Sequence, residues 1–138
     1  MTPGSQAPYP TARLLAVIAI TACGLIAFWT VIRMAAGLDD VLYCGGIIGL
    51  LAATAAHLIG TMVGAILAPG KGASAAYLAS TLVRFVLTPA LAVSLYFLLL
   101  VKPQPVLVGA AAGYLLILLA DIATMLQAMR QHTGSPST

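Results

Sequence analysis

The sequence predicts an all-α integral membrane protein whose four transmembrane helices form an antiparallel, up-and-down bundle. Hydrophobic residues make up 62% of the 138 residues, and charged residues only 7%. A soluble domain of this size carries about 25% charged residues, so the composition is that of a membrane protein. The apolar residues fall into long stretches separated by short connectors of proline, glycine and charged residues. Each stretch exceeds the roughly 20 residues with which a helix crosses the hydrocarbon core.

In chain order, the predicted transmembrane helices span residues 13–36, 41–68, 73–101 and 105–129. They form a single transmembrane domain, 13–130. Before it, residues 1–12 contain three prolines and no charge, and are expected to be a disordered N-terminal segment. After it, the polar residues 131–138 are expected to be a flexible tail.

The connectors around the predicted helix ends are at most four residues long: 37–40, 69–72 and 102–105, the last of which includes the first residue of the fourth helix. They leave no room for a soluble domain, a nucleotide-binding loop or an active site outside the membrane. The basic residues are shared unequally between the two sides, with Arg13, Lys71 and Arg130 on one side and Arg33 and Lys102 on the other. The positive-inside rule therefore places both termini in the cytoplasm. The net charge of +3 is too small and scattered to indicate nucleic-acid binding.

Small residues recur at four-residue spacing in two of the predicted helices, which lets helix backbones approach closely in a membrane. The glycines expected to pack helices in this way are Gly45, Gly49, Gly60, Gly64, Gly109 and Gly113. These rows pack either within the bundle or against a second copy or a partner protein.

Arg84 and Asp121 are charged residues deep inside apolar stretches, where a charge costs roughly 2.5–3.5 kcal/mol on insertion scales. Arg84 lies nineteen residues before Pro103 and Asp121 eighteen after it, so an antiparallel hairpin brings them to one depth. His57 and Arg84 are similarly matched about Gly70. The sequence therefore predicts an Arg84–Asp121 salt bridge with His57 close by.

Further polar residues share helix faces with these three and are expected to support the layer: Thr54, Thr61, Tyr77, Ser80, Thr81, Thr88, Tyr114 and Thr124. Two interpretations remain open. The layer either fixes the register of the helices, or forms a site for an ion, a proton or the membrane carboxylate of a partner.

The chain is not expected to be an enzyme, because no nucleophile lies in a motif with a base and a group that orients the base. Metal and cofactor sites are not expected either. A single histidine within the apolar stretches cannot supply paired haem ligands, and no Cys/His cluster suits zinc.

Three segments resemble the ATP synthase protein I family: Gly45–Gly49 opening the second predicted helix, the basic Arg84 within 82–88, and 113–116 in the fourth. The resemblance covers residues 12–130. It implies a non-enzymatic accessory protein of the bacterial inner membrane that helps the ring of ATP synthase rotor subunits assemble. Arg84 would match the basic residue of the family's third helix, whereas Asp121 departs from the pattern. The alternative is a small transporter or channel for a divalent cation or a proton. It would form a homo-oligomer in which the His57/Arg84/Asp121 layer lines a polar path.

Overall fold

The computed structural model describes residues 9–99 and 102–133, which fold into four helices. These are α1 (Thr11–Ala36), α2 (Asp40–Lys71), α3 (Ala73–Leu99) and α4 (Pro103–Thr133). All four are long and apolar enough to cross a membrane. Because lipid offers no hydrogen-bond partners, an apolar stretch crossing it must satisfy its own backbone groups, as a helix does. The predicted all-α, four-helix membrane architecture is confirmed.

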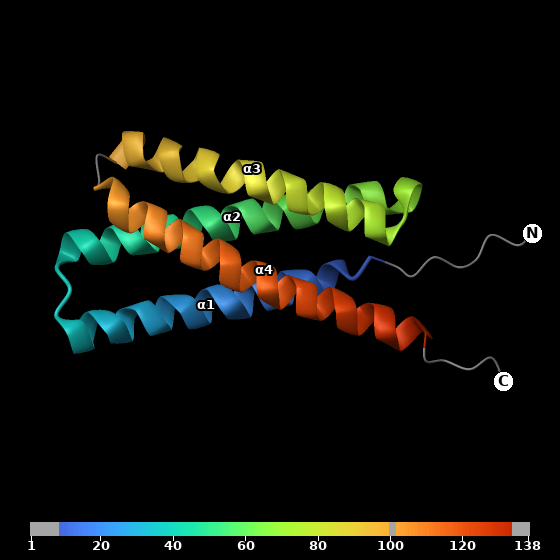
Figure 1. Cartoon of the computed structure of the whole chain (residues 1–138), viewed down its shortest axis with the longest axis horizontal. Coiled ribbons are helices and arrows are strands. Elements are labelled where there is room, and N and C mark those ends of the chain that lie inside the picture. Colours follow the sequence, from blue (N-terminus) through green and yellow to red (C-terminus); the bar gives the residue numbers. More distant parts are fainter. Residues whose placement is uncertain (1–8, 100–101, 134–138) are drawn as a thin grey trace, which may run out of the picture.

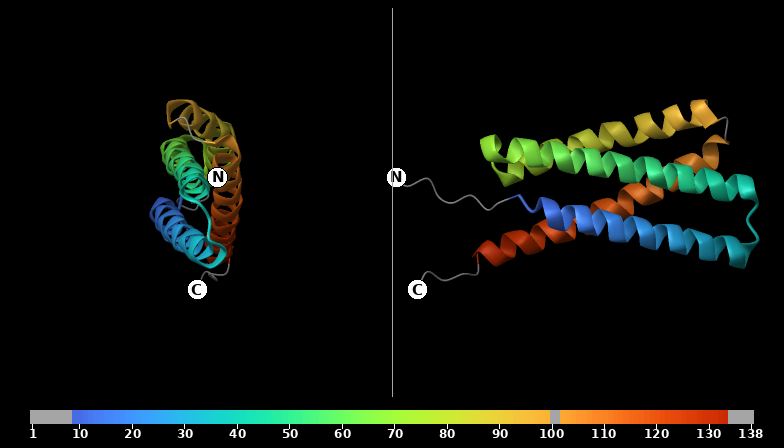
Figure 2. Two further views of the ribbon diagram at one scale, coloured as in Figure 1. Left: turned by 90° about the vertical axis from the view of Figure 1, so that its left-hand side faces the viewer. Right: turned by 180° about the vertical axis from the view of Figure 1, so that it is seen from behind.

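Figure 1 shows that successive helices run in opposite directions, so that the start of α1, the α2–α3 turn and the end of α4 lie at one end of the bundle, here called the terminal end. The α1–α2 and α3–α4 connections lie at the other end, here called the connector end. The helices do not occupy the four corners of a square. Figure 2 shows α1, α2 and α3 side by side, with α4 crossing their common face diagonally. The central helix α2 packs extensively against both α3 and α4, whereas α3 and α4 have the smallest contact of any touching pair.

The predicted boundaries of the helices are correct to within four residues. At the prolines, the predicted connectors are too long and the helices too short. Pro69 lies in the last turn of α2 rather than in a connector, and Pro103 is the first residue of α4. A proline is tolerated in the first turn of a helix because the N–H group that it lacks would have no partner there. α3 ends at Leu99, and residues 100 and 101, which were included in the third predicted helix, lie outside the described part.

The predicted terminal segments are too long on the sides that face the domain. α1 begins at Thr11, inside the segment 1–12, and residues 131–133 continue α4 rather than beginning the tail. The remaining parts of those two predictions, 1–8 and 134–138, lie outside the described residues.

The turn between α1 and α2 is specified locally by two residues. Gly37 ends α1 in the left-handed conformation, with φ of 63°, and its N–H donates to the carbonyl of Arg33 at 3.0 Å. Asp39 then caps α2, its carboxylate accepting from the backbone N–H of Leu42 at 2.8 Å. Glycine avoids the steric cost of a positive φ, and an aspartate cap satisfies a free N–H. The residues of this turn therefore specify its conformation without help from the rest of the bundle.

The small residues of α2 divide that helix into two packing surfaces. In its first half the contacts are with α4 and α1. A Cβ on Gly109 would collide with the backbone of Gly46, one on Gly49 with the backbone of Val106, and one on Gly46 with the ring of Trp29 in α1. In its second half, Cβ atoms on Gly60 and Gly64 would collide with α3 residues and with Tyr9. The glycine rows therefore pack within the bundle, and they allow α2 to lie at its centre.

Replacing Gly109 with alanine should destabilise the bundle by about 1–3 kcal/mol, because the added methyl group has no space between the α2 and α4 backbones. The matched control is Gly24→Ala in α1, where nothing lies within 4 Å of the new Cβ. That change should stabilise the protein by about 0.5–1 kcal/mol, since alanine favours a helix interior. Denaturant unfolding in detergent micelles measures both, and equal effects would contradict the assigned α2–α4 packing.

Candidate functional site

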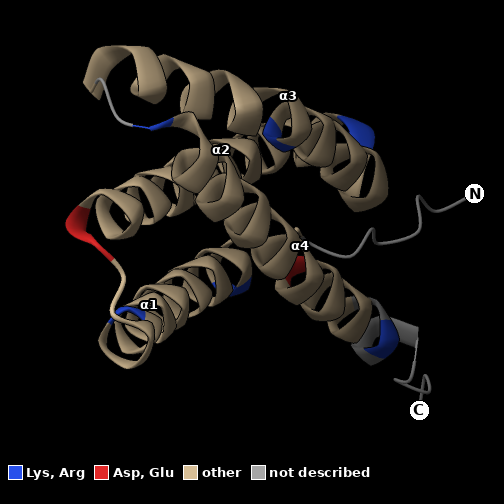
Figure 3. Ribbon diagram, turned by 60° about the vertical axis from the view of Figure 1, so that its left-hand side comes forward, with Lys and Arg blue, Asp and Glu red and all other residues tan. Residues whose placement is uncertain are grey.

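The charged residues of the described chain gather at the ends of the helices, and positions within α3 and α4 are the exception (Figure 3). Those positions are Arg84 and Asp121, whose side chains have no solvent exposure. Both point into the bundle rather than toward the surrounding lipid.

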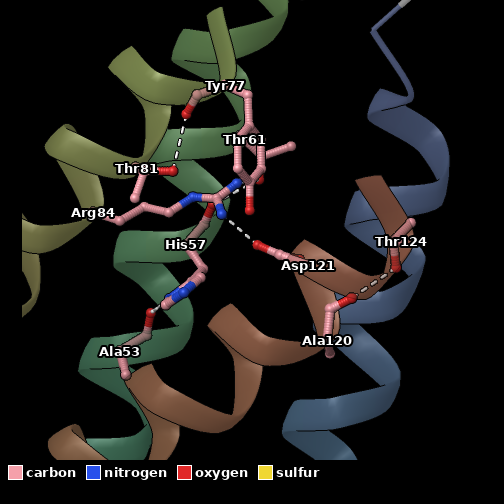
Figure 4. Close-up of polar contacts among 9 residues, drawn as sticks. All are labelled: Ala53, His57, Thr61, Tyr77, Thr81, Arg84, Ala120, Asp121 and Thr124. Atoms are coloured by element: carbon pink, nitrogen blue, oxygen red, sulfur yellow. Dashed lines mark hydrogen bonds and ion pairs between the residues drawn. The ribbon is translucent and has the colours of Figure 1, made fainter. Parts of the chain in front are cut away.

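Arg84 and Asp121 form an ion pair in which Nη1 of the arginine donates to Oδ2 of the aspartate (Figure 4). The pair joins α3 to α4. Charge-assisted hydrogen bonds of this kind are stronger than neutral ones, and removing one partner from a buried pair leaves the other charge uncompensated. The predicted salt bridge is therefore present, and it lies at the common depth that the residue counting indicated.

Thr61, rather than His57, is the α2 residue that bonds to Arg84. Nη2 of the arginine donates to the Thr61 hydroxyl at 2.6 Å, and that hydroxyl donates to the carbonyl of His57 at 2.9 Å. The cause is the direction of side chains on a helix, which lean toward its amino end. The amino end of α3 lies at the terminal end of the bundle, so the guanidinium reaches one turn closer to that end than its own Cα.

Gly60 provides the space that the arginine side chain occupies. A Cβ at this position would lie 2.8 Å from Arg84 Nε and would collide with the aliphatic part of the same side chain. Any larger residue would therefore displace Arg84. Gly64, one turn further along α2, provides similar space for Ser80 and for the hydroxyl of Tyr9.

His57 is fully buried one turn from the ion pair, toward the connector end. Its Nδ1 lies 2.9 Å from the carbonyl of Ala53, and because a carbonyl can only accept, Nδ1 carries the proton. The ring packs against Tyr114 of α4, with centroids 5.2 Å apart. Its contacts are thus a backbone carbonyl and an aromatic ring, and it has no direct bond to either charge.

Apart from Tyr114, which packs against His57, the predicted supporting residues separate into two groups. Tyr77, Ser80 and Thr61 lie at the ion pair, and Figure 4 shows the Tyr77 ring beside the Arg84 guanidinium, whose carbon is 5.9 Å from the ring centroid. The other threonines bond to carbonyls of their own helices, at 2.8–2.9 Å: Thr54, Thr81, Thr88 and Thr124. These four satisfy local backbone groups and do not extend the network between helices.

Sequence reasoning missed two contributions. Tyr9 lies in the segment that was expected to be disordered, yet its hydroxyl is buried at Gly64. Near the connector end, the Trp29 indole donates to the carbonyl of Tyr43 at 3.3 Å, and the Arg33 guanidinium lies 4.6 Å from the Tyr43 ring centroid. A tryptophan, a tyrosine and an arginine near the end of a membrane helix are a signal of interfacial anchoring that could have identified this second group.

A recess of about 220 Å³ lies between α3 and α4, on the side of the polar layer toward the connector end. Its lining is almost entirely apolar: Phe85, Thr88, Pro89, Ala92, Leu107, Ala110, Ala111 and Tyr114. It follows from the crossing of the two helices, whose mutual contact is small.

The polar layer is electrically neutral, since Arg84 and Asp121 balance one another and the fully buried His57, close to the Arg84 charge, is a neutral ring with its proton on Nδ1. Within residues 9–99 and 102–133, no group of three or more His, Cys, Asp or Glu side chains converges as metal ligands would. The arrangement can therefore fix the relative positions of α2, α3 and α4, and it can bind small neutral polar molecules more readily than ions.

Comparisons of the chain with protein-family models, with curated proteins and with solved structures find no match.

Replacing either Arg84 or Asp121 alone with leucine should destabilise the protein by about 3–5 kcal/mol, because the remaining charge would be buried without a partner. The double variant should be destabilised by much less than the sum of the two, since it leaves no such charge. The matched control is the Arg33–Asp40 pair, at 2.6 Å, whose side chains are 41% and 81% exposed. Removing that pair should cost less than about 1 kcal/mol.

Unfolding free energies of the singles and doubles at both sites measure these couplings. Additive effects at Arg84 and Asp121 would show that the two charges do not stabilise each other in the folded protein.

Proposed function

We propose that this multi-pass membrane protein is a non-enzymatic accessory protein that assists the assembly of a larger complex in a bacterial inner membrane. The complex that the sequence resemblance implies is the ring of ATP synthase rotor subunits, and both termini would face the cytoplasm. The resemblance rests on the glycine-rich start of α2, on the segment around Arg84 and on the middle of α4.

The observation that carries the proposal is the enclosure of both interior charges. Arg84 and Asp121 have no exposed side-chain surface and bond to each other, so neither is available to a passing ion or to the carboxylate of a partner. What the protein presents to its surroundings is instead an apolar surface rich in large side chains, together with short connectors. Such a surface can contact other transmembrane helices through packing.

In this proposal the polar layer is structural, and partners contact the outer faces of the bundle. Arg84 then contributes by holding the shape that those faces require. Of the two interpretations of the polar layer, this proposal takes the one in which the layer fixes the register of the helices, and not the one in which it meets the membrane carboxylate of a partner.

Deleting the gene from its native host should lower the amount of assembled rotor ring without changing the synthesis of its subunits. Native gel electrophoresis with immunodetection measures the ring, and affinity-purified protein should bring the subunits down. Supplying the wild-type chain should restore assembly, and the Arg84→Leu/Asp121→Leu double variant should do so to the extent that it folds. A normal ring yield in the deletion strain would overturn the proposal.

The alternative, a small ion transporter or channel, has one observation in its favour, which is the concentration of buried polar atoms around Arg84. Against it stands the connector half of the bundle, where α2 and α4 meet backbone to backbone at Gly46 and Gly109. Purified protein in liposomes should therefore conduct neither protons nor divalent cations across a range of pH. A protein-dependent flux that is lost in the Arg84→Leu/Asp121→Leu variant would favour transport over assembly.

A further inference from the structure

The recess between α3 and α4 faces the lipid that surrounds the bundle. Small buried residues, Ala92 and Ala110, lie at its floor, and large apolar side chains stand at its rims: Phe85 of α3, which is 65% exposed, and Leu107 of α4, which is 51% exposed. A second recess, of about 50 Å³, shares Ala92 and Leu107 with the first and continues it toward the connector end. The two form one channel along the surface, here called the α3–α4 groove.

The groove is about as long as one leaflet of the hydrocarbon core is thick. On α3 it extends from Phe85 to Tyr96, and on α4 from Tyr114 back to Pro103. Each span covers eleven residue steps, which is ~16 Å at the helical rise of ~1.5 Å per residue. Half of a hydrocarbon core that is ~30 Å thick is ~15 Å. The groove therefore extends from the connector end to about the middle of the bilayer.

The two ends of the groove differ in character. At the inner end, the rings of Phe85 and Tyr114 meet edge to face, with centroids 6.4 Å apart, and so bridge α3 and α4. At the connector end, Tyr96 lines the groove beside Pro103, and the residue directly before that proline is the exposed Lys102. Tyrosine and lysine are typical of the level of the lipid headgroups. One end is thus apolar and bridged, whereas the other lies at the membrane surface with a positive charge.

The dimensions and the lining of the groove favour a hydrocarbon chain as its occupant. Over ~16 Å, a helix ~10 Å in diameter occupies roughly 1,200 Å³, so a partner helix cannot enter. The larger recess measures about 220 Å³. Thr88 lines it, but the hydroxyl of this residue donates to the carbonyl of Arg84 at 2.8 Å and does not need a bond from the occupant. An apolar space left empty would forfeit van der Waals contacts that the surrounding lipid chains can supply.

We propose that the α3–α4 groove binds one acyl chain of a phospholipid from the leaflet at the connector end, with the phosphate of that lipid beside Lys102. The chain lies along Ala92 and Leu107 and ends near the contact between Phe85 and Tyr114. It fills the space that α3 and α4 leave as they diverge from the connector end (Figure 1), and it adds contacts between two helices that touch little. The site is separate from the polar layer and does not rest on the assembly function.

Photo-crosslinking of the unchanged chain locates the lipid. The full chain is reconstituted in bilayers of phosphatidylethanolamine and phosphatidylglycerol that contain a small fraction of phosphatidylglycerol with a diazirine near the end of one acyl chain. Mass spectrometry after irradiation should find several-fold more label on Phe85 and Tyr114 than on their neighbours Val86 and Leu115. These neighbours are matched in depth and are 61% and 57% exposed, so they report the lipid that merely surrounds the protein. Equal labelling of the two sets would overturn the proposal.

A substitution that fills the groove tests the same site by lipid retention. Ala111 and Ala112 are adjacent exposed alanines of α4, and of the two it is Ala111 that lines the groove. Native mass spectrometry of protein purified with phosphatidylglycerol should show one lipid retained by the wild type and by Ala112→Trp. Retention by Ala111→Trp should be on the order of tenfold lower, because the indole takes the place of the acyl chain and of its contacts. Lys102→Ala should lower retention about fivefold through loss of the attraction to the headgroup, and Lys102→Arg should restore it.

Lys71→Ala, at the terminal end, is the control for general loss of positive charge and should leave retention unchanged. Equal retention by Ala111→Trp and Ala112→Trp would contradict an acyl chain in the groove. A lipid-free dimer that Ala111→Trp dissociates would assign the groove to a second copy of the chain and would contradict the proposal as well.

Discussion

Among the helices that touch, the ion pair between Arg84 and Asp121 joins the two that pack least against each other. α3 and α4 are each attached to α2 by close packing, but they diverge from one another and leave an apolar recess between them. Their other direct contacts are few, and one of them is between the rings of Phe85 and Tyr114, whose centroids are 6.4 Å apart. A charged bond in a low-dielectric interior is strong and directional, so one contact can set this geometry.

The glycines of α2 make this bond possible. Gly60 leaves room for the aliphatic part of Arg84, and Gly49, together with Gly109 of α4, lets the α2 and α4 backbones approach closely. Close backbone approach and buried charge are thus two parts of one arrangement. The first provides the van der Waals contact that holds membrane helices together, and the second fixes which residues face each other. For function, this means that the interior polar side chains bond to one another, and the outer apolar faces are the surfaces that partners can contact.

Much of this could be predicted from the sequence, because membrane insertion constrains it strongly. Long apolar runs predicted the helices, and counting residues from the turns predicted that Arg84 and Asp121 would meet. The same counting placed His57 close to them, but it did not identify Thr61 as the α2 residue that bonds to Arg84, because it located Cα atoms and ignored the lean of a long side chain toward the amino end of α3. Tyr9 could not be predicted, since a single aromatic residue before a helix has no periodic pattern. The diagonal path of α4 likewise depends on packing between residues far apart in the chain.

Solid-state NMR on the full chain in lipid bilayers measures the central contact most directly. With ¹⁵N in the arginine guanidinium groups and ¹³C in the aspartate carboxylates, dipolar recoupling detects pairs in hydrogen-bond contact. Two such couplings are expected, one from Arg84 to Asp121 and one from Arg33 to Asp40, and the Arg33→Leu change should remove only the second. A spectrum of the Arg33→Leu variant without any arginine–aspartate coupling would contradict the buried pair, and with it the arrangement of α3 and α4.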